Sequence, residues 1–591
     1  MNIMEVKLRE FHGITDNVIE KILRMRGVQK KNVGKYLFPD DSMKPDYKKL
    51  NNIEAGIDLL NHHINQKSHV LVCFDADYDG WTSGAIMVQY ITKDLGYPED
   101  LVDRYVPHTK VHGIPEDYVL ETLPDLVIVP DAGSSDYDTH KKLANKGIST
   151  LVIDHHEAPS ESSDAVVINN QLSPNFPNKG LTGANMAHLF CEAYSDKFNN
   201  GESVEKYLDL AFTGMIADRA SLLDEGCFWY LSKGSQNIQN NLLKQLIAKS
   251  NNLEENKPIN AKDVGWEISP NFNALTRSGK PEDIELVVDA LLGKEYTVYN
   301  NRLKMDTPVV EESVRRMINT RNRQSKIVKE AMEQIEERIE EKRTNENKII
   351  FVNATDIIDD PSITGLVATK IASNYKKPAL ILKYYPERNE LSGSGRNFTD
   401  SPITSLKDVL EKTGLFSMVA GHPNAHGASI ELDKAFEVTE ALNELLADVE
   451  YDNLLHVVDL RYSQEPDARE ILEIAKHSHL WGEGLFEPVV HVEDIQIPKK
   501  DIKFIGQKGD TWKLNLKTCD AIMFKLTESQ KLALTNHEED LIRLSIVGEC
   551  SINTYRGQQK PQIIIKDFEA EGLADYEQNP WQNFDVTALP F

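Results

Sequence analysis

A short apolar run that ends in three evenly spaced aspartates constrains this chain more than any other feature. Residues 71–74 are expected to form a buried strand, and Asp75, Asp77 and Asp79 follow it before Gly80 breaks the pattern. In an extended segment, residues i, i+2 and i+4 share one face, so the three carboxylates converge where the strand ends. They repel one another unless cations hold them. For a single motif of this kind, the alternative is an acidic turn in solvent.

Further apolar runs also end in acids or histidines. The runs and the residues after them are 126–130 before Asp131, 151–153 before Asp154-His155-His156, and 208–217 before Asp218. Between residues 84 and 194 the chain alternates helical and strand patterns, as in a doubly wound parallel sheet. Because open α/β sheets gather the carboxyl ends of parallel strands along one edge, we expect these side chains to meet in one crevice.

These residues resemble the motifs of the DHH phosphoesterase family. Its pattern is D-x-D-x-D-G, a strand-borne Asp, D-H-H, and a later Asp in a G-x-(I/V)-A-D context, and all four parts are present in that order. Residues 264–295 also resemble a segment that reads P-R-x-N-A-x-x-R in the family's RecJ branch of single-strand-specific exonucleases. Asn273, Ala274 and Arg277 match it, whereas Asn271 stands where arginine is usual, which puts one phosphate contact in question.

The second half of the chain resembles the DHHA1 domain that accompanies DHH domains. The resemblance rests on residues 391–396 (LSGSGR) and 420–427 (AGHPNAHG). It implies that Ser394, Arg396 and His422 contact substrate, because a serine hydroxyl and an arginine fork both bind phosphate. His426 stands where the family commonly has alanine. An arginine that the family uses near the second strand is replaced by Thr109, so a preference for a 5′-phosphate is expected to be weaker here.

Length and patterning predict a multidomain α/β protein. A chain of 591 residues is too long for one core. Residues 1–47 are expected to be a helical lead-in, 48–305 a DHH domain with a doubly wound parallel sheet, and 306–345 one long bridging helix. A DHHA1 α/β domain is expected at 346–450, a helical connector and an OB-like β-barrel at 451–575, and a flexible tail at 576–591.

The late domain is expected to bind single strands. Five short strand patterns between residues 487 and 570 suggest an OB-type barrel, which combines a basic groove with stacking aromatics. The candidate residues are Lys513, Lys517, Lys525 and Arg556 for charge, and Trp512 and Phe524 for stacking, with a core position as the equal alternative for both aromatics. The net charge of −27 argues against a nucleic-acid partner but leaves room for a local basic groove.

The interpretation that joins these features is a RecJ-like, metal-dependent exonuclease acting on single-stranded DNA from the 5′ end in repair, recombination or replication. Polarity and substrate come from the resemblance. Two divalent ions are expected, with Mn²⁺ preferred and Mg²⁺ possible, because the ligands mix imidazole and carboxylate. Asp131 is expected to bridge them, Asp77 and Asp75 to hold one, and Asp79, His155 and Asp218 the other. His156 is expected to contact the scissile phosphate, and Asp154 to orient the histidines.

Two other functions fit parts of the pattern. One is a phosphodiesterase of short oligonucleotides or cyclic dinucleotides, which the OB-like domain disfavours. The other is a non-catalytic DNA-binding scaffold, which the intact ligand positions disfavour. No apolar run is long enough for a membrane span, and the first residues lack a signal peptide, so a cytoplasmic enzyme without a membrane partner is expected.

The last sixteen residues contain a possible docking peptide. Trp581, Phe584, Leu589 and Phe591 are costly to leave in water if nothing binds them. The ending Leu589-Pro590-Phe591 is similar to the terminus by which bacterial single-strand-binding proteins recruit partners. The alternative is that these aromatic side chains fold back onto the chain's own surface.

Overall fold

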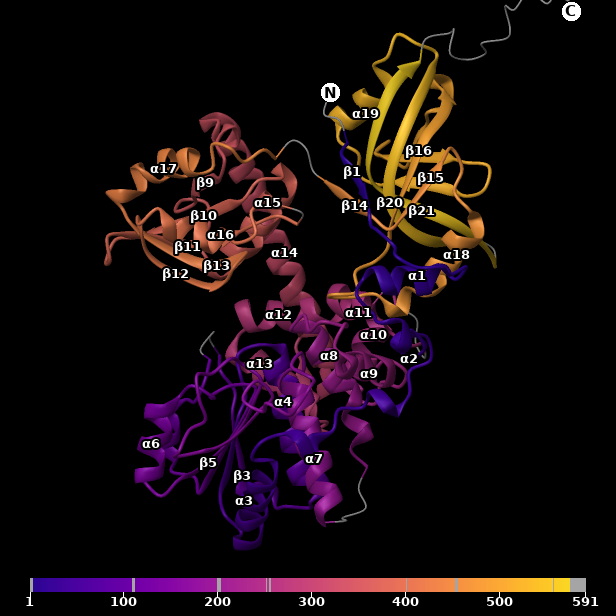
Figure 1. Cartoon of the computed structure of the whole chain (residues 1–591). Coiled ribbons are helices and arrows are strands. Elements are labelled where there is room, and N and C mark those ends of the chain that lie inside the picture. The colour runs from indigo at the N-terminus through magenta and orange to yellow at the C-terminus, as the bar shows by residue number, and fades with distance from the viewer. Residues whose placement is uncertain are drawn as a thin grey trace, which may run out of the picture.

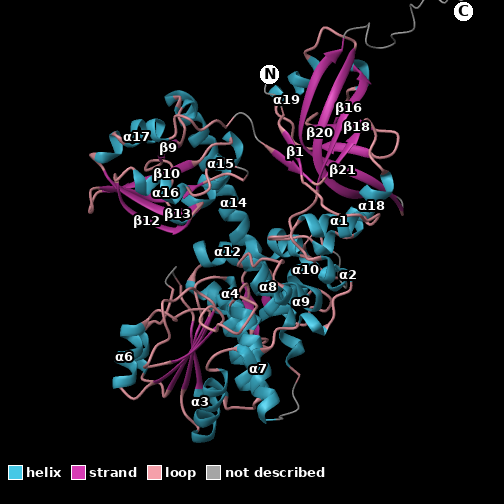
Figure 2. Ribbon diagram, in the orientation of Figure 1, coloured by secondary structure: helices cyan, strands magenta, loops and turns pink. Residues whose placement is uncertain are grey.

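The computed structural model describes residues 4–108, 112–198, 203–250, 252–253, 257–399, 401–451, 455–555 and 557–573. Thr109, Arg556 and the predicted tail at 576–591 lie outside these ranges. The described chain forms three units, each built around one sheet (Figures 1 and 2). Within the described ranges, every helix is either too short or too polar to span a bilayer.

The first sheet has five parallel strands in the order β3-β2-β4-β5-β6. They are β2 (Val70–Cys73), β3 (Val102–Tyr105), β4 (Leu126–Pro130), β5 (Ser149–Asp154) and β6 (Val166–Asn169). The central strands are buried on both faces, which explains their continuous apolar runs. The order of the strands changes direction at β2, because β3 is added on one side of β2 and β4 on the other. Open α/β sheets bind ligands at such a point.

Helices cover both faces of this sheet. On one face, Val72 and Ile153 pack with α3 (Ile53–Gln66), α4 (Tyr78–Gln89) and α7 (Gly183–Phe198). On the other, Val127 and Val152 pack with α5 (Glu116–Thr122) and α6 (Tyr137–Asn145). The expected doubly wound α/β fold is therefore confirmed.

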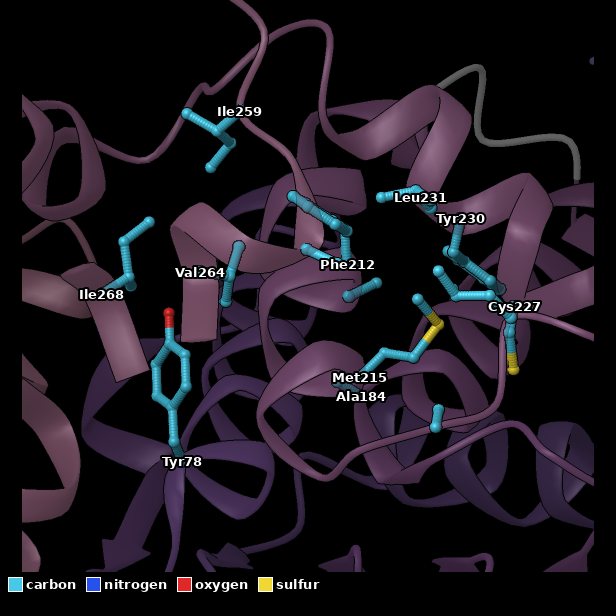
Figure 3. Close-up of a cluster of buried hydrophobic side chains, with 14 of the residues drawn as sticks. Tyr78, Ala184, Phe212, Met215, Cys227, Tyr230, Leu231, Ile259, Val264 and Ile268 are labelled. Atoms are coloured by element: carbon cyan, nitrogen blue, oxygen red, sulfur yellow. The ribbon is translucent and has the colours of Figure 1, made fainter. Parts of the chain in front are cut away.

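Helices complete the first unit beyond the sheet. They are α8 (Leu208–Ala217), α9 (Glu225–Gly234), α10 (Asn241–Lys249), α11 (Ala261–Asp263), α12 (Ser269–Ser278) and α13 (Pro281–Leu291). The apolar segment before Asp218 is thus a helix, not a strand. Figure 3 shows Tyr78, Phe212 and Met215 among the buried side chains of this core. Tyr78 also stacks on Phe272 with 3.9 Å between ring centroids, which anchors the loop that carries the aspartates.

The N-terminal lead-in is not wholly helical. It contains α1 (Val18–Met25) and α2 (Val33–Leu37), but it begins with strand β1 (Val6–Leu8). This strand pairs in parallel with β14 (His456–Val458), so the start of the chain lies beside the third unit (Figure 1). A three-residue strand whose partner lies about 450 residues away leaves no local pattern in the sequence.

A single long helix joins the first two units, as the sequence predicts. The hairpin of β7 (Thr297–Asn300) and β8 (Met305–Pro308) leads into α14 (Val309–Lys342). Val314 and Met317 on its first half are buried in the core of the first unit. Ile335 and Ile339 on its second half are buried in the core of the second. The helix therefore sets the separation between the two units.

The second unit is an α/β domain around a mixed five-stranded sheet in the order β12-β13-β11-β10-β9. Its strands are β9 (Ile350–Asn353), β10 (Ala379–Tyr385), β11 (Glu390–Arg396), β12 (Phe416–His422) and β13 (Ala425–Glu431). Its helices are α15 (Thr364–Tyr375), α16 (Leu406–Lys412) and α17 (Val438–Leu445).

The third unit is a seven-stranded sheet in the order β15-β16-β20-β21-β19-β18-β17. Its elements are β15 (Leu460–Ser463), α18 (Ala468–Lys476), β16 (Val489–Pro498), β17 (Phe504–Ile505), β18 (Thr511–Asn515), β19 (Asp520–Met523), α19 (Glu528–Thr535), β20 (Leu541–Tyr555) and β21 (Gln558–Leu573). Among the described strands no pairing joins β15 to β17, so the sheet is OB-like without the closed barrel that the sequence suggests.

One expectation for this third unit is wrong, and one alternative that the sequence left open is decided. The connector at 451–481 is only partly helical, because β14 and β15 precede α18 and β15 joins the sheet. These strands are three and four residues long and depend on distant partners, so their pattern is too short to recognise. Trp512 is fully buried, with its ring 5.3 Å from that of Phe568, and is therefore a core residue rather than a stacking platform.

Candidate active site at the edge of the first sheet

The first two aspartates lie in the loop between β2 and α4. Asp75 is buried, and Asp77 caps α4 by accepting a 3.1 Å hydrogen bond from the backbone N–H of Gly80. The strand ends at Cys73 and the helix begins at Tyr78, so the aspartates do not share one extended segment. They converge because a tight strand-to-helix turn brings them together at the point where the sheet reverses.

Asp79 lies in the first turn of α4 and faces α7. Its Oδ1 accepts hydrogen bonds from Thr182 Oγ1 at 3.0 Å and from the backbone N–H of Ala184 at 3.3 Å. Its Oδ2 is buried and has no hydrogen-bond partner in the described chain. A buried carboxylate oxygen without a partner is costly unless a ligand completes it.

Asp131 follows β4 directly and has a left-handed backbone, with φ of 69°. Its backbone N–H donates to the carbonyl of Ile153 at 2.9 Å, which ties the turn to β5. The start of α7 packs so closely here that a Cβ on Gly183 would lie 2.3 Å from Asp131 Oδ1. The small residue at this position therefore makes room for the Asp131 carboxylate.

The two histidines after β5 point in different directions. His155 Nε2 lies 3.1 Å from Asp131 Oδ1 and 3.7 Å from Asp218 Oδ2, the carboxylate at the end of α8. His156 is more exposed, and its Nδ1 lies 2.8 Å from Asp154 Oδ1. Asp154 also accepts from the backbone N–H groups of both histidines, so it holds the loop in place, as predicted from its position.

The oxygen and nitrogen atoms of these residues fall into groups with metal-site spacing. One group is Asp75, Asp77 and Asp131, and a second is Asp79, His155 and Asp218, with ligand atoms within 4.8 Å of one another in each. A third group consists of Asp131, Asp154, His155 and His156. Asp154 and His156 already bind each other, which leaves the first two groups as the freer donor sets.

The electrostatics of the cluster show how strongly it lacks positive charge. Burial, followed by the neighbouring Asp77, raises the pKa of Asp79 to about 7. Burial, followed by Asp79 and Asp77, raises the pKa of Asp218 to about 8. Burial and the same acidic neighbours raise the pKa of Asp131 well above its usual value. Since each carboxylate opposes ionisation of the next, a bound cation would relieve all of them.

The histidines respond to burial and to Asp154 in opposite ways. Burial, followed by the charge of His156, lowers the pKa of His155 to about 4, which favours the neutral ring that a metal ligand needs. The hydrogen bond that His156 donates to Asp154 raises the pKa of His156 to about 9. Burial acts to raise the pKa of Asp154, but His156 and Ser134 lower it overall. The neutral ring is therefore favoured for His155, whereas the cationic ring is favoured for His156.

His112 belongs to this site although no motif singled it out. Its Nδ1 lies 2.6 Å from Asp75 Oδ2, and the ring is partly exposed. The hydrogen bond that His112 donates to Asp75 raises the pKa of His112. One weak signal in the sequence is a histidine before the Gly113 turn and after a strand of the same sheet. A lone loop histidine does not reveal which carboxylate it will meet.

The arginines predicted to contact substrate meet between α12 and the second unit. Burial lowers the pKa of Arg396, and the positive charge of nearby Arg277 lowers it further. Arg396 donates to the carbonyls of Gly395 at 2.7 Å and His426 at 3.1 Å. A Cβ on Gly365, in the first turn of α15, would lie 2.6 Å from the Arg396 guanidinium. This glycine leaves space for the cationic group.

The other predicted substrate contacts divide into two sets. Ser394 Oγ lies 2.9 Å from Thr364 Oγ1, beside Arg396 at the start of α15. Asn273 lies on α12 with Arg277, where its Nδ2 donates to Ser269 Oγ at 3.1 Å. His422, by contrast, is exposed at the end of β12, and its carbonyl accepts from His426 Nδ1 at 3.4 Å.

Two residues that the sequence left open have structural roles. Asn271, which stands where arginine is usual, is buried, and its Nδ2 donates to the carbonyl of Glu267 at 2.6 Å. The Asn271 side chain is therefore used in a hydrogen bond to the preceding turn of the same helical segment. His426 is buried against Gly395, and its carbonyl accepts the hydrogen bond from Arg396. His426 thus helps to fix the direction of that arginine.

The predicted groove residues of the third unit are scattered. Lys513 is paired with Asp520 at 3.0 Å, and Lys517, Phe524 and Lys525 are exposed near the β18–β19 edge.

Comparison with protein families matches two parts of the chain. The model of the DHH family N-terminal domain matches residues 69–215, and the model of the RecJ OB domain matches residues 458–567. The first match contains β2, β4 and β5 with the residues that follow them. The second contains most of the third sheet.

Named relatives match nearly the whole chain. A putative SPbeta prophage-derived single-strand DNA-specific exonuclease, YorK, from Bacillus subtilis (strain 168), is 36% identical over 578 residues, which cover 96% of this chain and 98% of the relative. The single-stranded-DNA-specific exonuclease RecJ of the same bacterium is 25% identical over 93% of this chain and 66% of its own length. The crystal structure of RecJ in complex with Mn²⁺ from Thermus thermophilus has the same fold, with a TM-score of 0.71 at 20% identity over 94% of this chain and 76% of that one.

Proposed function

The chain belongs to the RecJ family of single-strand-DNA-specific exonucleases, and we propose that it removes nucleotides from the 5′ end of single-stranded DNA by metal-dependent hydrolysis. The observation that carries this proposal is the meeting of two donor groups, Asp75–Asp77–Asp131 and Asp79–His155–Asp218, at the point where the first sheet reverses. The names of the relatives given above are those of exonucleases of this substrate class.

The donor set fits a pair of divalent cations. Asp79 Oδ2 and Asp131 Oδ1 are buried without a hydrogen bond in the described chain, and burial, followed by the neighbouring carboxylates, raises the pKa of both residues. Asp75 and Asp77 would hold one ion, Asp79, His155 and Asp218 would hold the other, and Asp131 would contribute to both. Imidazole beside carboxylates favours Mn²⁺ over Mg²⁺. Such ions supply Lewis acidity to a phosphodiester and lower the pKa of an attacking water.

His156 is assigned to the substrate and not to the metals. Asp154 holds its Nδ1 at 2.8 Å, which leaves Nε2 of this exposed ring as the donor for a substrate. A cationic imidazole in this position would donate to a phosphate oxygen and stabilise the charge that develops there. Asp154 acts through His156, since it orients the ring and does not reach the substrate itself.

The arginine pocket at α15 is assigned to the 5′ end of the strand. Arg396 presents a guanidinium that binds a terminal phosphate in a bidentate manner, and Ser394 lies beside it. Arg277 contributes a second positive charge, and Asn273 lies one helical turn before it. These contacts support cleavage that begins at the 5′ end. His422 lies exposed on the rim of the same unit, where only a longer substrate would contact it.

A digest of end-labelled strands tests this function. Wild-type protein with Mn²⁺ is expected to release labelled mononucleotide at once from 5′-labelled single strands, and to shorten 3′-labelled strands progressively. Duplex DNA and reactions with EDTA should remain intact. Immediate release of label from the 3′ end would contradict the polarity. Hydrolysis limited to dinucleotides or cyclic dinucleotides would favour the small-substrate phosphodiesterase, and metal binding without any hydrolysis would favour the non-catalytic scaffold.

We also propose that the tail recruits a single-strand-binding protein or another replication or recombination protein. This proposal rests on its aromatic residues and its Leu589-Pro590-Phe591 ending. Deletion of residues 577–591 should abolish that binding and leave the nuclease rate and melting temperature unchanged. A markedly lower melting temperature would show instead that the tail packs on the chain's own surface.

A further inference from the structure

A cavity of about 1070 Å³ opens between the first unit and the third sheet. Ala217 and Arg219, the neighbours of Asp218 on both sides, line one end of it. Its lining also includes Lys262 on α11, Trp266 between α11 and α12, Glu549 on β20 and Lys566 on β21. The cavity therefore connects the end of α8, where a candidate metal ligand lies, with the inner side of the OB-like sheet.

The positive charges along this cavity are already paired within the chain, with four carboxylates serving five cations. It is lined by five lysines and arginines, and each has a carboxylate partner. Arg9 and Arg26 bind Asp459, Arg219 binds Glu483 at 2.9 Å, Lys262 binds Glu487 at 2.9 Å, and Lys566 binds Glu549. A cation that is already paired gains little when it exchanges a carboxylate for a phosphate. Phosphate neutralisation is therefore a weak source of affinity in this cavity.

The cavity also presents aromatic side chains that remain largely exposed to solvent. Trp266 is 69% exposed and Phe486 is 51% exposed, and both line it. Leu455, just before β14, and Val457, on β14, add further exposed apolar surface. Trp266 lies in a π-helical turn at 264–268, and Arg321 fixes that turn by donating to the carbonyl of Trp266 at 3.0 Å. Exposed aromatic side chains held on ordered backbone are suited to stack against planar ligands.

We propose that this cavity is a base-stacking track in which Trp266 and Phe486 bind unpaired bases of the DNA strand held at the metal site. The proposal rests on the proposed nuclease function. Base–aromatic stacking accepts every base, because each has a π-face, and it needs bases that are free of a partner strand. The track therefore selects single strands through their exposed bases, and it allows a protein of net charge −27 to hold DNA without a strongly basic groove.

The location differs from the one that the sequence suggests for the third unit. Phe524 is also exposed, but it lies at the β18–β19 edge, outside the residues that line the cavity. Trp512 is in the core. The cavity side of the sheet, formed by residues of β16, β20 and β21, is continuous with the residues that flank Asp218. This continuity is the reason for placing the strand on this side of the sheet.

Binding measurements without metal test the track separately from the chemistry. The probes are a labelled dT20 and an abasic strand of the same length, which keeps the phosphates but lacks the bases, measured by fluorescence anisotropy in EDTA. The variants are Trp266→Ala, Phe486→Ala and Trp266→Phe. The control is Phe436→Ala, which removes an 84% exposed phenylalanine from the second unit.

Each alanine variant is expected to weaken dT20 binding roughly 5- to 100-fold, the effect of losing one base–aromatic stack. Binding of the abasic strand should change less than twofold, and Trp266→Phe should recover most of the affinity. The wild-type salt dependence should be shallow, because full neutralisation of phosphates by all five cations would give a slope of about −3.5. Equal losses on dT20 and abasic DNA, unchanged affinity for dT20, or a salt slope of that size would overturn the proposal.

Cleavage assays separate failure of the track from failure of the nuclease function. With Mn²⁺, wild type and Trp266→Ala should cleave a 5′-phosphorylated dinucleotide at the same rate, because it is too short to enter the cavity. On dT20, Trp266→Ala should show a raised KM. If wild type cleaves neither substrate, the function is wrong. If it cleaves both and Trp266→Ala cleaves dT20 with an unchanged KM, only the track is wrong. A Phe524→Ala variant with the larger binding loss would move the track to the other edge.

Discussion

The first two units each gather buried charge of one sign, but they do so in different ways. At the edge of the first sheet, carboxylates crowd together, and burial with acidic neighbours raises the pKa of Asp79, Asp131 and Asp218. At the start of α15, Arg277 and Arg396 lie together, and burial lowers the pKa of both. Each cluster is unfavourable by itself, and each becomes favourable when a ligand of opposite charge arrives. The carboxylates match divalent cations, and the arginines match a terminal phosphate.

The two clusters also differ in what holds them. The carboxylates are attached to the ends of neighbouring strands and to helices of one unit, so a single fold fixes them. Arg277 belongs to the first unit and Arg396 to the second, so their separation depends on how α12 packs beside the second unit. Ser278 contributes to that packing through contacts of 3.4 Å with Asp360 and Ser362. Mutations in the first cluster should therefore change metal binding, whereas mutations in the second should change how the two units pack together.

Removing the central carboxylate should have the largest effect. Asp131→Ala is expected to lower kcat by more than about 100-fold, since loss of an outer partner of a metal ligand alone costs about 10- to 100-fold. Steady-state cleavage of single-stranded DNA with saturating Mn²⁺ measures it. The matched control is Asp138→Ala, an exposed aspartate on α6. A variant that keeps a tenth of the wild-type rate would show that Asp131 does not bridge the ions.

Filling the space beside this carboxylate should break the same site without removing a ligand. Gly183→Ala places a methyl group 2.3 Å from Asp131 Oδ1, so the carboxylate must move. Mn²⁺ affinity, measured by calorimetry, is expected to fall at least about tenfold, as for loss of an outer partner of a metal ligand. Gly34→Ala is the control, because a Cβ there meets no atom within 4 Å. Unchanged affinity in Gly183→Ala would mean that the cluster tolerates rearrangement.

The arginine pocket should discriminate between strand ends. Arg396→Ala is expected to reduce kcat/KM on 5′-phosphorylated strands by roughly 10- to 100-fold, as for loss of a charged hydrogen bond. On 5′-hydroxyl strands the loss should be only a fewfold, so the preference for a phosphate should disappear. Arg388→Ala, at an exposed turn of the same unit, serves as the control. Equal rates on both ends in wild type and in Arg396→Ala would dismiss the pocket.

A smaller effect should appear in the stability of the metal-free protein. Asp79 and Asp218 titrate near 7 and 8 when folded, against about 3.9 when unfolded, so the folded chain holds more protons between these values. Its stability should therefore fall as the pH rises from about 4 to 8. The melting temperature should decrease by roughly 2–4 °C for each kcal/mol lost. Asp79→Asn should lessen this decrease and Mn²⁺ should remove it, whereas an identical decrease in Asp79→Asn would contradict the assigned shift.

Much of the architecture was determined by local sequence. Continuous apolar runs at 126–130 and 151–153 predict strands buried on both faces, and that pattern survives in any context because hydrophobicity is an intrinsic property of the side chains. Asp131 and the Asp154-His155-His156 segment follow those runs, so the parallel order of the strands alone brings them to one edge. The long polar helix with a narrow apolar face is predictable for the same reason. Each of these inferences needs only residues that are neighbours in sequence.

Only the tertiary structure decided the features that depend on distant partners. β1 and β15 are three and four residues long and exist because β14 and β16 pair with them. His112 joins the acidic cluster through a loop, and Trp512 is drawn into the core while Trp266 remains exposed. An aromatic or histidine side chain has nearly the same local pattern in either role. Its role is decided by which surfaces pack against it, and that free energy belongs to the folded assembly of units rather than to any segment.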